Sequence, residues 1–162
     1  MTSRPGQEAL ELRPLRDAEL PQVIDVMRPA YAAERAHADH LSYEEALAFV
    51  ARQYAELLPN GVATAGHHFA WLNEAETQST IGFVWYFFDQ SLDNAYVYYL
   101  YVAPEHRRQG FATAALKLVE QAARSVGCVR IGLNVFAPNE AAKSLYRQAQ
   151  YAVVSQHLNK AL

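Results

Sequence analysis

The chain has 162 residues, of which 51% are hydrophobic and 19% are charged, and its formal net charge is −3. This is the composition of one globular domain, and it argues against long disordered segments. The acidic balance disfavours general attraction to nucleic acid, and no apolar run reaches the roughly 20 residues of a membrane span. Cys128 is the only cysteine, which excludes an internal disulfide. Because the N-terminus also lacks a hydrophobic secretory segment, we expect a cytoplasmic protein.

The first half of the chain predicts one strand and two helices. Residues 1–8 read as a loose arm, and residues 9–162 as a single domain that begins with a strand at 10–15. Asp17 is a candidate N-cap for a helix that Pro29 is expected to disrupt, which leaves a loop at 29–42. Ser42 and Glu45 have the spacing of a capping box, and the helix behind them should end at Pro59-Asn60-Gly61.

The second half predicts a sheet with two more helices. Strands are expected at 68–72, 81–88 and 96–102 as an antiparallel meander, followed by an amphipathic helix that ends at Gly127. A strand at 129–135, a helix at 141–148 and a last strand at 151–158 complete the order β-α-α-β-β-β-α-β-α-β. The fold class is therefore α/β, in the sense of a mixed α+β sheet, and the 96–135 unit is long enough for a parallel crossover.

The stretch between the third strand of the meander and the amphipathic helix carries the strongest chemical signal. Val102-Ala103-Pro104 ends the strand, and a basic turn with Gly110 leads into the helix. Unpaired amide groups at a helix start point outward together, and nearby arginines add positive charge, so this arrangement suits a phosphate group. The turn lacks the spacing of a Walker A loop and of a GxGxxG loop, and taken on its own it favours a surface loop that caps a core helix.

Two motifs in order make the chain resemble the GNAT superfamily of N-acetyltransferases over about residues 10–158. The first is the turn Arg107-x-x-Gly110-x-Ala112 after a strand that ends in Val-x-Pro. The second is Asn139, Ala142, Leu145 and Tyr146, with Tyr151 as the later aromatic residue. One strand separates the two motifs, as in the superfamily.

The resemblance implies an enzyme that transfers an acetyl group from acetyl-coenzyme A to a primary amine, with no metal. It places the pyrophosphate on the backbone amides of the turn and the pantetheine arm along the strand that precedes it. Asn139 would bond the pantetheine, and Tyr146 would donate a proton to the departing thiolate. The coenzyme-binding residues implied in this way are Leu100, Tyr101, Val102, Arg107, Arg108, Gln109, Gly110, Phe111, Ala112, Thr113 and Asn139.

One position departs from the superfamily pattern. Many relatives carry a glutamate base two residues before the x-Pro pair, where this chain has Tyr101. Glu34, His67, His68 and Glu105 are candidates for the base by residue type only, and water relayed to solvent is a further option.

The acceptor side of the reaction is left open. A small-molecule amine is slightly favoured over a peptide or protein amine, and some of the tyrosines of the central strands could line an aromatic acceptor pocket. Tyr96, Tyr98 and Leu100 are expected on one face, and Val97, Tyr99 and Tyr101 on the other. His37, Asp39 and His40 match no standard zinc spacing and read as solvated loop residues.

One alternative function and the oligomeric state remain open. The chain could be a non-catalytic acyl-coenzyme A-binding protein of the same fold, because Tyr101 replaces the expected acid. The oligomeric state is open, with a homodimer as one option because the superfamily often dimerises.

Overall fold

The structure, a computed structural model, describes residues 10–162 and divides the chain into two compact units. The first unit joins the residues up to Arg16 with Ala65–Asn134, and the second joins Asp17–Thr64 with Val135–Leu162. The arm expected at residues 1–8 lies outside the described part of the chain, and a single domain from residue 9 onward stays a prediction.

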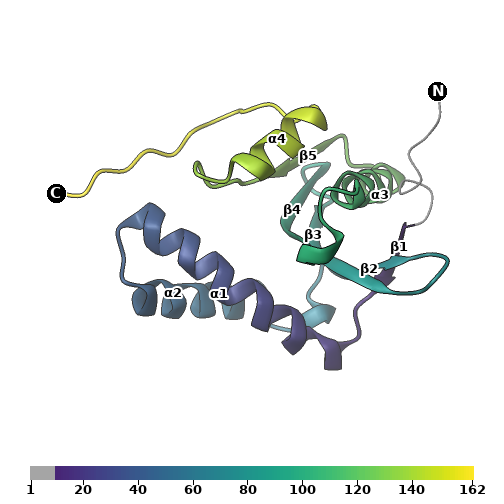
Figure 1. Cartoon of the computed structure of the whole chain (residues 1–162), viewed down its shortest axis with the longest axis horizontal. Coiled ribbons are helices and arrows are strands. Elements are labelled where there is room, and N and C mark those ends of the chain that lie inside the picture. The colour runs from purple at the N-terminus through teal and green to yellow at the C-terminus, as the bar shows by residue number, and fades with distance from the viewer. Residues whose placement is uncertain (1–9) are drawn as a thin grey trace. The chain divides into compact units, whose positions relative to one another are not determined.

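The first unit is a five-stranded mixed sheet with one long helix. The strands lie across the sheet in chain order (Figure 1). The first four pair antiparallel, and the fifth pairs parallel with the fourth through a helical crossover. The meander and the crossover are therefore confirmed. The elements are β1 (Leu10–Pro14), β2 (His67–Glu74), β3 (Thr80–Asp89), β4 (Asn94–Val102), α3 (Phe111–Ser125) and β5 (Arg130–Leu133).

Helix α3 forms because its apolar residues recur at helical spacing and face the sheet. Ala115, Leu116 and Val119 are at most 1% exposed, and the helix contacts β1, β3 and β4. Gly127 follows the helix with a φ of +92°, the left-handed conformation typical of the residue just past a helix end. The expected C-terminal stop of this helix is confirmed.

A β-bulge at Tyr98 changes the faces of the central tyrosines. Trp85 pairs with Tyr99, whereas the next residue of β3, Tyr86, pairs with Val97, so Tyr98 is the extra residue of β4. The ring of Tyr98 stacks on Trp85 with centroids 4.5 Å apart. Directly paired residues share a face of a sheet, so Tyr96 and Tyr99 lie on the same face as their partners in β3. The predicted strict alternation of tyrosines along β4 is therefore wrong, because it assumed an unbroken period of two.

The second unit begins with two long helices, α1 (Leu20–Asp39) and α2 (Tyr43–Leu57), which pack on each other (Figure 1). The capping box is confirmed, because the Ser42 hydroxyl accepts a hydrogen bond from the Glu45 amide and the Glu45 carboxylate accepts one from the Ser42 amide. This pair fixes the start of α2, and the first turn of the helix is acidic as its dipole favours.

The predicted break at Pro29 is wrong, since α1 continues through it to Asp39. Proline in a helix interior removes one hydrogen bond and costs about 3 kcal/mol. Met27 and Ala32, on either side of Pro29, are both fully buried, and their burial offsets that cost. The segment predicted as a loop at 29–42 is therefore mostly helix, and the helix determines which way each of its side chains points.

The second unit ends with α4 (Glu140–Gln148), and the last predicted strand is wrong. Residues 151–162 form neither helix nor strand. Val153, Val154 and Leu158 are 78%, 95% and 86% exposed, so neither face of this segment is buried, and burial is what a weakly alternating strand needs to form. Across residues 10–162, no helix is long and apolar enough to cross a membrane.

Candidate functional site

The end of β4 has a neighbouring strand on one side only. The parallel pairing of β4 with β5 stops at Val97 and Leu133, whereas the pairing of β4 with β3 continues to Val102. The bulge at Tyr98 begins where the parallel pairing stops. Residues 100–102, predicted to accompany the pantetheine arm, therefore lie on a stretch of strand whose other edge is not covered by β5.

A close approach of the backbone holds this end of β4 in place. A Cβ added at Gly82 in β3 would lie 2.0 Å from the carbonyl oxygen of Tyr101, a distance that no side chain tolerates. Gly82 pairs with Val102, which is buried. Glycine is therefore required at this position, since it alone lets the two strands pass so closely.

The basic turn after β4 folds back on the strand. Pro104–His106 form one turn of 3₁₀-helix, and the Nε of Arg107 donates to the carbonyl oxygen of Val102 at 2.9 Å. The guanidinium of Arg107 also lies over the ring of Tyr101, 5.9 Å from its centroid. Arg107 therefore braces the strand end. Arg107 and Arg108 are both exposed, and because the Nε of Arg107 is already bonded to the strand, Arg108 is the arginine with its whole guanidinium available to an anion.

Two left-handed residues shape the rest of the turn. Arg108 has a φ of +60° and Gly110 has a φ of +88°. The side-chain amide of Gln109 donates to the carbonyl of Glu105 at 3.1 Å, which closes the turn on itself. Gly110 is the N-cap of α3, and nothing lies within 4 Å of where its Cβ would be, so glycine is needed here for its backbone conformation and leaves open space beside it.

The first turn of α3 presents amides without a helical acceptor. The first backbone bond of the helix runs from the Ala114 amide to the Gly110 carbonyl, so the amides of residues 111–113 precede the helical ladder. Phe111 is buried and meets the ring of His106 edge-on, which anchors the start of the helix in the core. Ala112 and Thr113 are partly exposed. These features fit an anion at the helix N-terminus.

Tyr101, at the position of the usual acid, is a packing residue. Its ring stacks on Phe83 with centroids 5.1 Å apart and has the Arg107 guanidinium on it. A ring held in this way shapes the surface at the end of β4. It supplies no carboxylate for proton abstraction.

In the second unit, the structure brings three polar side chains together from two helices. Asn139 is the N-cap of α4, where its Oδ1 accepts from the Ala142 amide at 3.1 Å. Its Nδ2 donates to Oε1 of Glu34 on α1 at 3.5 Å. Tyr146 lies nearly two helical turns further along α4, close enough to Glu34 for the negative charge of that carboxylate to affect its pKa. Only Asn139 and Tyr146 were expected together from their motif.

Burial sets the protonation of this cluster. It raises the pKa of Tyr146, and the negative charge of Glu34 raises that pKa further, so the phenol keeps its proton through neutral pH. Burial also raises the pKa of Glu34, although the hydrogen bond from Asn139 lowers it in part. The cluster thus holds a protonated phenol beside a carboxylate of increased basicity.

The two histidine candidates for the base lie in the aromatic layers of the first unit. The indole N–H of Trp85 donates to Nδ1 of His67 at 3.0 Å, and an indole nitrogen can only donate, so the lone pair of His67 Nδ1 is occupied. His67 also packs on Phe87 and Tyr98. Burial, and the charge of His68 to a smaller extent, lower the pKa of His67. His67 is therefore a neutral packing residue, and the sequence carries no signal for this bond.

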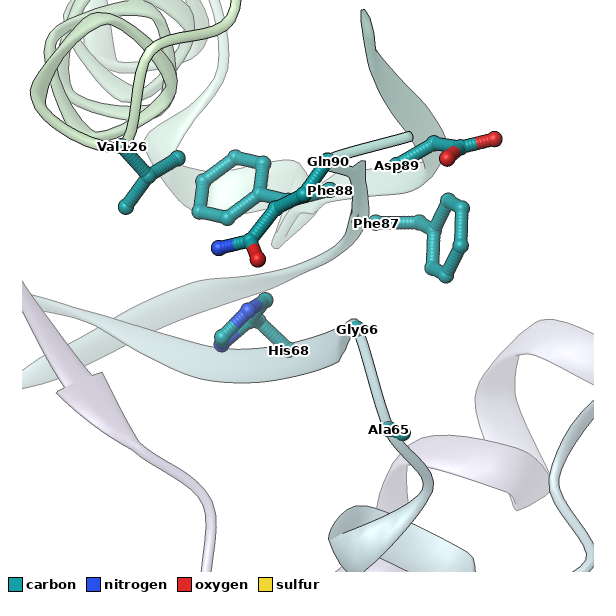
Figure 2. A pocket seen from close by; sticks show the side chains of 8 residues that line it. All are labelled: Ala65, Gly66, His68, Phe87, Phe88, Asp89, Gln90 and Val126. Atoms are coloured by element: carbon teal, nitrogen blue, oxygen red, sulfur yellow. The ribbon is translucent and has the colours of Figure 1, made fainter. Parts of the chain in front are cut away.

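His68 points to the other face of the sheet and lines a pocket in the first unit. Its ring stacks on Tyr86 with centroids 5.1 Å apart, and burial lowers its pKa. Figure 2 shows His68 opposite Phe88, Gln90 and Val126 across this cavity of about 420 Å³. The pocket is lined by Ala65, Gly66, His68, Phe87, Phe88, Asp89, Gln90 and Val126. None of these residues belongs to the basic turn, so the pocket is separate from the predicted coenzyme residues.

The remaining candidates for a metal do not come together. Asp39 binds Arg35, with Oδ2 and Nη2 2.6 Å apart, and its other oxygen accepts from Asn159. In the part of the chain that the structure describes, no group of three His, Cys, Asp or Glu side chains could hold a metal ion.

Comparison with known proteins places this architecture in a family. The sequence model of the acetyltransferase (GNAT) family matches residues 22–151, so the chain belongs to that family. The uncharacterised N-acetyltransferase YycN of Bacillus subtilis is 28% identical over 153 residues, which cover 93% of this chain and 97% of YycN. The YycN crystal structure superposes with a TM-score of 0.87 over 94% of this chain and 98% of that one.

Two further structures share the fold at lower identity. PaiA N-acetyltransferase from Thermoplasma acidophilum, solved in complex with coenzyme A, is 19% identical with a TM-score of 0.64, over 87% of this chain and 88% of PaiA. The spermidine/spermine N-acetyltransferase SpeG from Vibrio cholerae, solved with manganese ions, is 18% identical with a TM-score of 0.63, over 92% and 81% of the two chains.

Proposed function

We propose that this protein is an acetyl-coenzyme A-dependent N-acetyltransferase that transfers the acetyl group directly to a primary amine within a ternary complex. The observation that carries the proposal is the turn of residues 107–113, where Arg108 and Gly110 are left-handed and the first amides of α3 precede the helical ladder. These amides and Arg108 would bind the pyrophosphate. The coenzyme A bound to PaiA supports the same coenzyme here.

The end of β4 before the turn is the proposed binding strand for the pantetheine arm. The amide and carbonyl groups of Leu100 would bond the arm, because they lie on the edge away from β3 and β5 does not extend alongside them. The carbonyl of Tyr101 points to Gly82 of β3 instead, so Tyr101 would contact the arm through its side chain. The amide of Val102 is the proposed donor to the tetrahedral oxyanion, since a pre-positioned amide donor stabilises charge that develops in the transition state.

Asn139 and Tyr146 take the remaining roles on the coenzyme side. Asn139 has two amide hydrogens on Nδ2, and only one is directed at Glu34, so the second could donate to a pantetheine carbonyl while Oδ1 caps α4. Tyr146 would donate its proton to the departing thiolate, because its raised pKa keeps the phenol protonated at neutral pH. These roles rest on the family motif together with the local geometry.

A small-molecule amine is the favoured acceptor over a peptide or protein amine. SpeG, which shares the fold, is named for transfer to the small amines spermidine and spermine. We also propose, from the family resemblance alone, that two copies of the chain form a homodimer.

A second candidate function is non-catalytic binding of an acyl-coenzyme A. The observation in its favour is the ring of Tyr101 at the position of the usual acid, packed on Phe83. The two candidates share the coenzyme and differ in turnover, so one experimental series separates them.

The test has two stages. Acetyl-coenzyme A should raise the melting temperature of the wild-type protein, and Gly110→Trp should abolish that shift, because the indole would occupy the open space beside the turn. Gly127→Trp is the matched control, since Gly127 also has a positive φ and open space around it but lies at the other end of α3. A wild-type protein without a shift would reject the coenzyme assignment.

In the second stage, labelled acetyl-coenzyme A is offered with polyamines, diamines, amino acids and peptides. Transfer to a small amine supports the proposal, and transfer to peptides alone would reassign the acceptor. Coenzyme binding without transfer to any amine would establish the non-catalytic alternative.

A further inference from the structure

Glu34 is a half-buried carboxylate that faces the two residues of the second family motif. It lies in the second half of α1, and its Oε1 is 3.5 Å from the side-chain nitrogen of Asn139, which is 105 positions away in the sequence. Its charge acts on Tyr146, which is also on α4. Because α1 continues through Pro29, the direction of the Glu34 side chain is set by the helix.

Within residues 10–162, no cationic side chain forms an ion pair with this carboxylate. The adjacent Arg35 is used elsewhere, since its guanidinium binds Asp39 and lies over the Phe49 ring, 4.8 Å from the centroid. A partly buried charge without a counter-ion costs free energy, and such groups concentrate where a ligand brings the missing charge. The missing charge here is positive.

Aromatic rings stand next to Glu34 on the same side of α1. Tyr31 is three residues before Glu34, so the two side chains are neighbours on the helix surface. The Tyr31 ring packs on Phe136, just before the Asn139 cap, with centroids 5.6 Å apart, and it also stacks on Tyr54. A carboxylate beside ring faces suits an alkylammonium group, which binds both.

We propose that Glu34 binds the ammonium group of the acceptor amine and acts as the general base that removes its proton. The assignment rests on the proposed acetyltransferase function. It supplies the carboxylate that Tyr101 does not, from α1 rather than from β4. It also defines the acceptor as a primary amine that is cationic in solution.

The proton balance of the step is as follows. One proton passes from R–NH₃⁺ to the Glu34 carboxylate, and the resulting amine nitrogen forms a bond to the thioester carbonyl carbon. The carbon–sulfur bond breaks, and Tyr146 gives its proton to the thiolate. The new amide nitrogen loses one proton, which restores the Tyr146 phenol through water, and Glu34 releases its proton to solvent. The products are R–NH–acetyl, coenzyme A as the thiol, and one H⁺.

Four polar or titratable side chains neighbour Glu34. Asn139 and Tyr146 face it from α4, and Tyr31 and His37 are its neighbours at helical spacing on α1. Burial raises the pKa of Glu34 and the Asn139 hydrogen bond lowers it in part. A raised pKa brings the carboxylate closer to the pKa of its proton donor, which favours general base catalysis.

The test is the pH dependence of kcat/KM for Glu34→Gln with an amine that the wild-type protein acetylates. At pH 7 the variant should lose about 10²–10⁴-fold, the usual contribution of a general base. Wild-type kcat/KM should be flat between the pKa of Glu34 and that of the amine. The variant depends on the neutral amine already in solution, whose fraction grows tenfold per pH unit, so its deficit should shrink about tenfold per unit as the pH rises.

The controls separate this proposal from the underlying function. Glu56→Gln, at an exposed position on α2, should match the wild type at every pH. Glu34→Asp keeps the charge and should retain a pH-independent region at a reduced rate. Coenzyme A should raise the melting temperature of Glu34→Gln as it does for the wild type, which shows that the variant is folded.

Three outcomes would overturn the assignment. A variant within twofold of the wild type at pH 7 would show that Glu34 is not the base. A deficit that is constant with pH would show that Glu34 only positions the amine. A wild-type protein that acetylates no amine would remove the proposed function and this inference together, whereas the first two outcomes leave the proposed function in place.

Discussion

The two units of the molecule differ in what holds their functional residues. In the first unit, backbone geometry fixes both the turn of residues 107–113, through left-handed residues and a helix start, and the end of β4, through the close passage of Gly82 past Tyr101. In the second unit, Glu34, Asn139 and Tyr146 are side chains whose chemistry depends on burial and charge. Steric demands thus shape the proposed binding element, and electrostatics shape the proposed catalytic one. Substitutions in the first unit should therefore lower stability, whereas substitutions in the second unit should lower catalytic rate.

The largest effect should come from Tyr146→Phe in the second unit. Loss of the phenol proton should lower kcat by about 10²–10⁴-fold while the affinity for coenzyme A stays unchanged, because the turn in the first unit is untouched. Steady-state kinetics together with calorimetric binding of coenzyme A measure the two effects. Tyr43→Phe, an exposed tyrosine on α2, is the control. An unchanged kcat would remove Tyr146 as the acid.

The next largest effect should be a loss of stability in the first unit, caused by Gly82→Ala. The added Cβ would meet the Tyr101 carbonyl oxygen at 2.0 Å, so β3 and β4 must separate, at a cost of about 1–3 kcal/mol of unfolding free energy. Gly132→Ala on β5 is the matched control, since its Cβ would lie 3.7 Å from the Tyr96 ring, an ordinary contact. Denaturant unfolding of both variants measures the difference. Equal stability of the two variants would contradict the steric role of Gly82.

The hydrogen bond between Trp85 and His67 should make the first unit sensitive to acid. Burial lowers the pKa of His67, so the unfolded chain takes up its proton first, near the ordinary value of about 6.5. The stability from neutral His67 is therefore complete above that value and is lost as the pH falls through the pKa of the folded state. Unfolding midpoints should fall between pH 7 and pH 5.

His67→Gln should flatten that decrease, because a glutamine carbonyl can accept from the indole without titrating. His37→Gln on α1, at an exposed position, should leave it as in the wild type. If His67→Gln has the same pH dependence as the wild type, the bond does not contribute to acid sensitivity.

The smallest effect is expected at the end of the second unit. Val154 is 95% exposed, so Val154→Asp should change the unfolding free energy by less than about 0.5 kcal/mol. Light scattering on the wild type and the variant provides a second readout. A wild-type mass of two chains that falls to one in the variant would place this segment in a homodimer interface and would contradict the expectation of a neutral surface position.

Local signals in the sequence predicted much of the first unit. The meander, the crossover and the glycine past the end of α3 follow from period-two and helical spacing with glycine at the helix end, and the structure confirms them. The capping box of Ser42 and Glu45 is equally local and is also confirmed. The prediction was wrong where tertiary burial overrode a local preference, as at Pro29, or where no burial supported a weak pattern, as in residues 151–158.

The residues of the candidate site also divide into those that local sequence patterns predicted and those that only the tertiary structure brought together. The sequence by itself determined the family, through the turn before α3 and the Asn139–Tyr146 motif, because each motif is a short run with its own local geometry. Only the tertiary structure decided which carboxylate faces that second motif. Glu34 is far from that motif in the sequence, and its neighbours are set by helix α1, which the sequence analysis expected to end at Pro29. Contacts between distant residues depend on how helices pack, and spacing along one chain does not encode them.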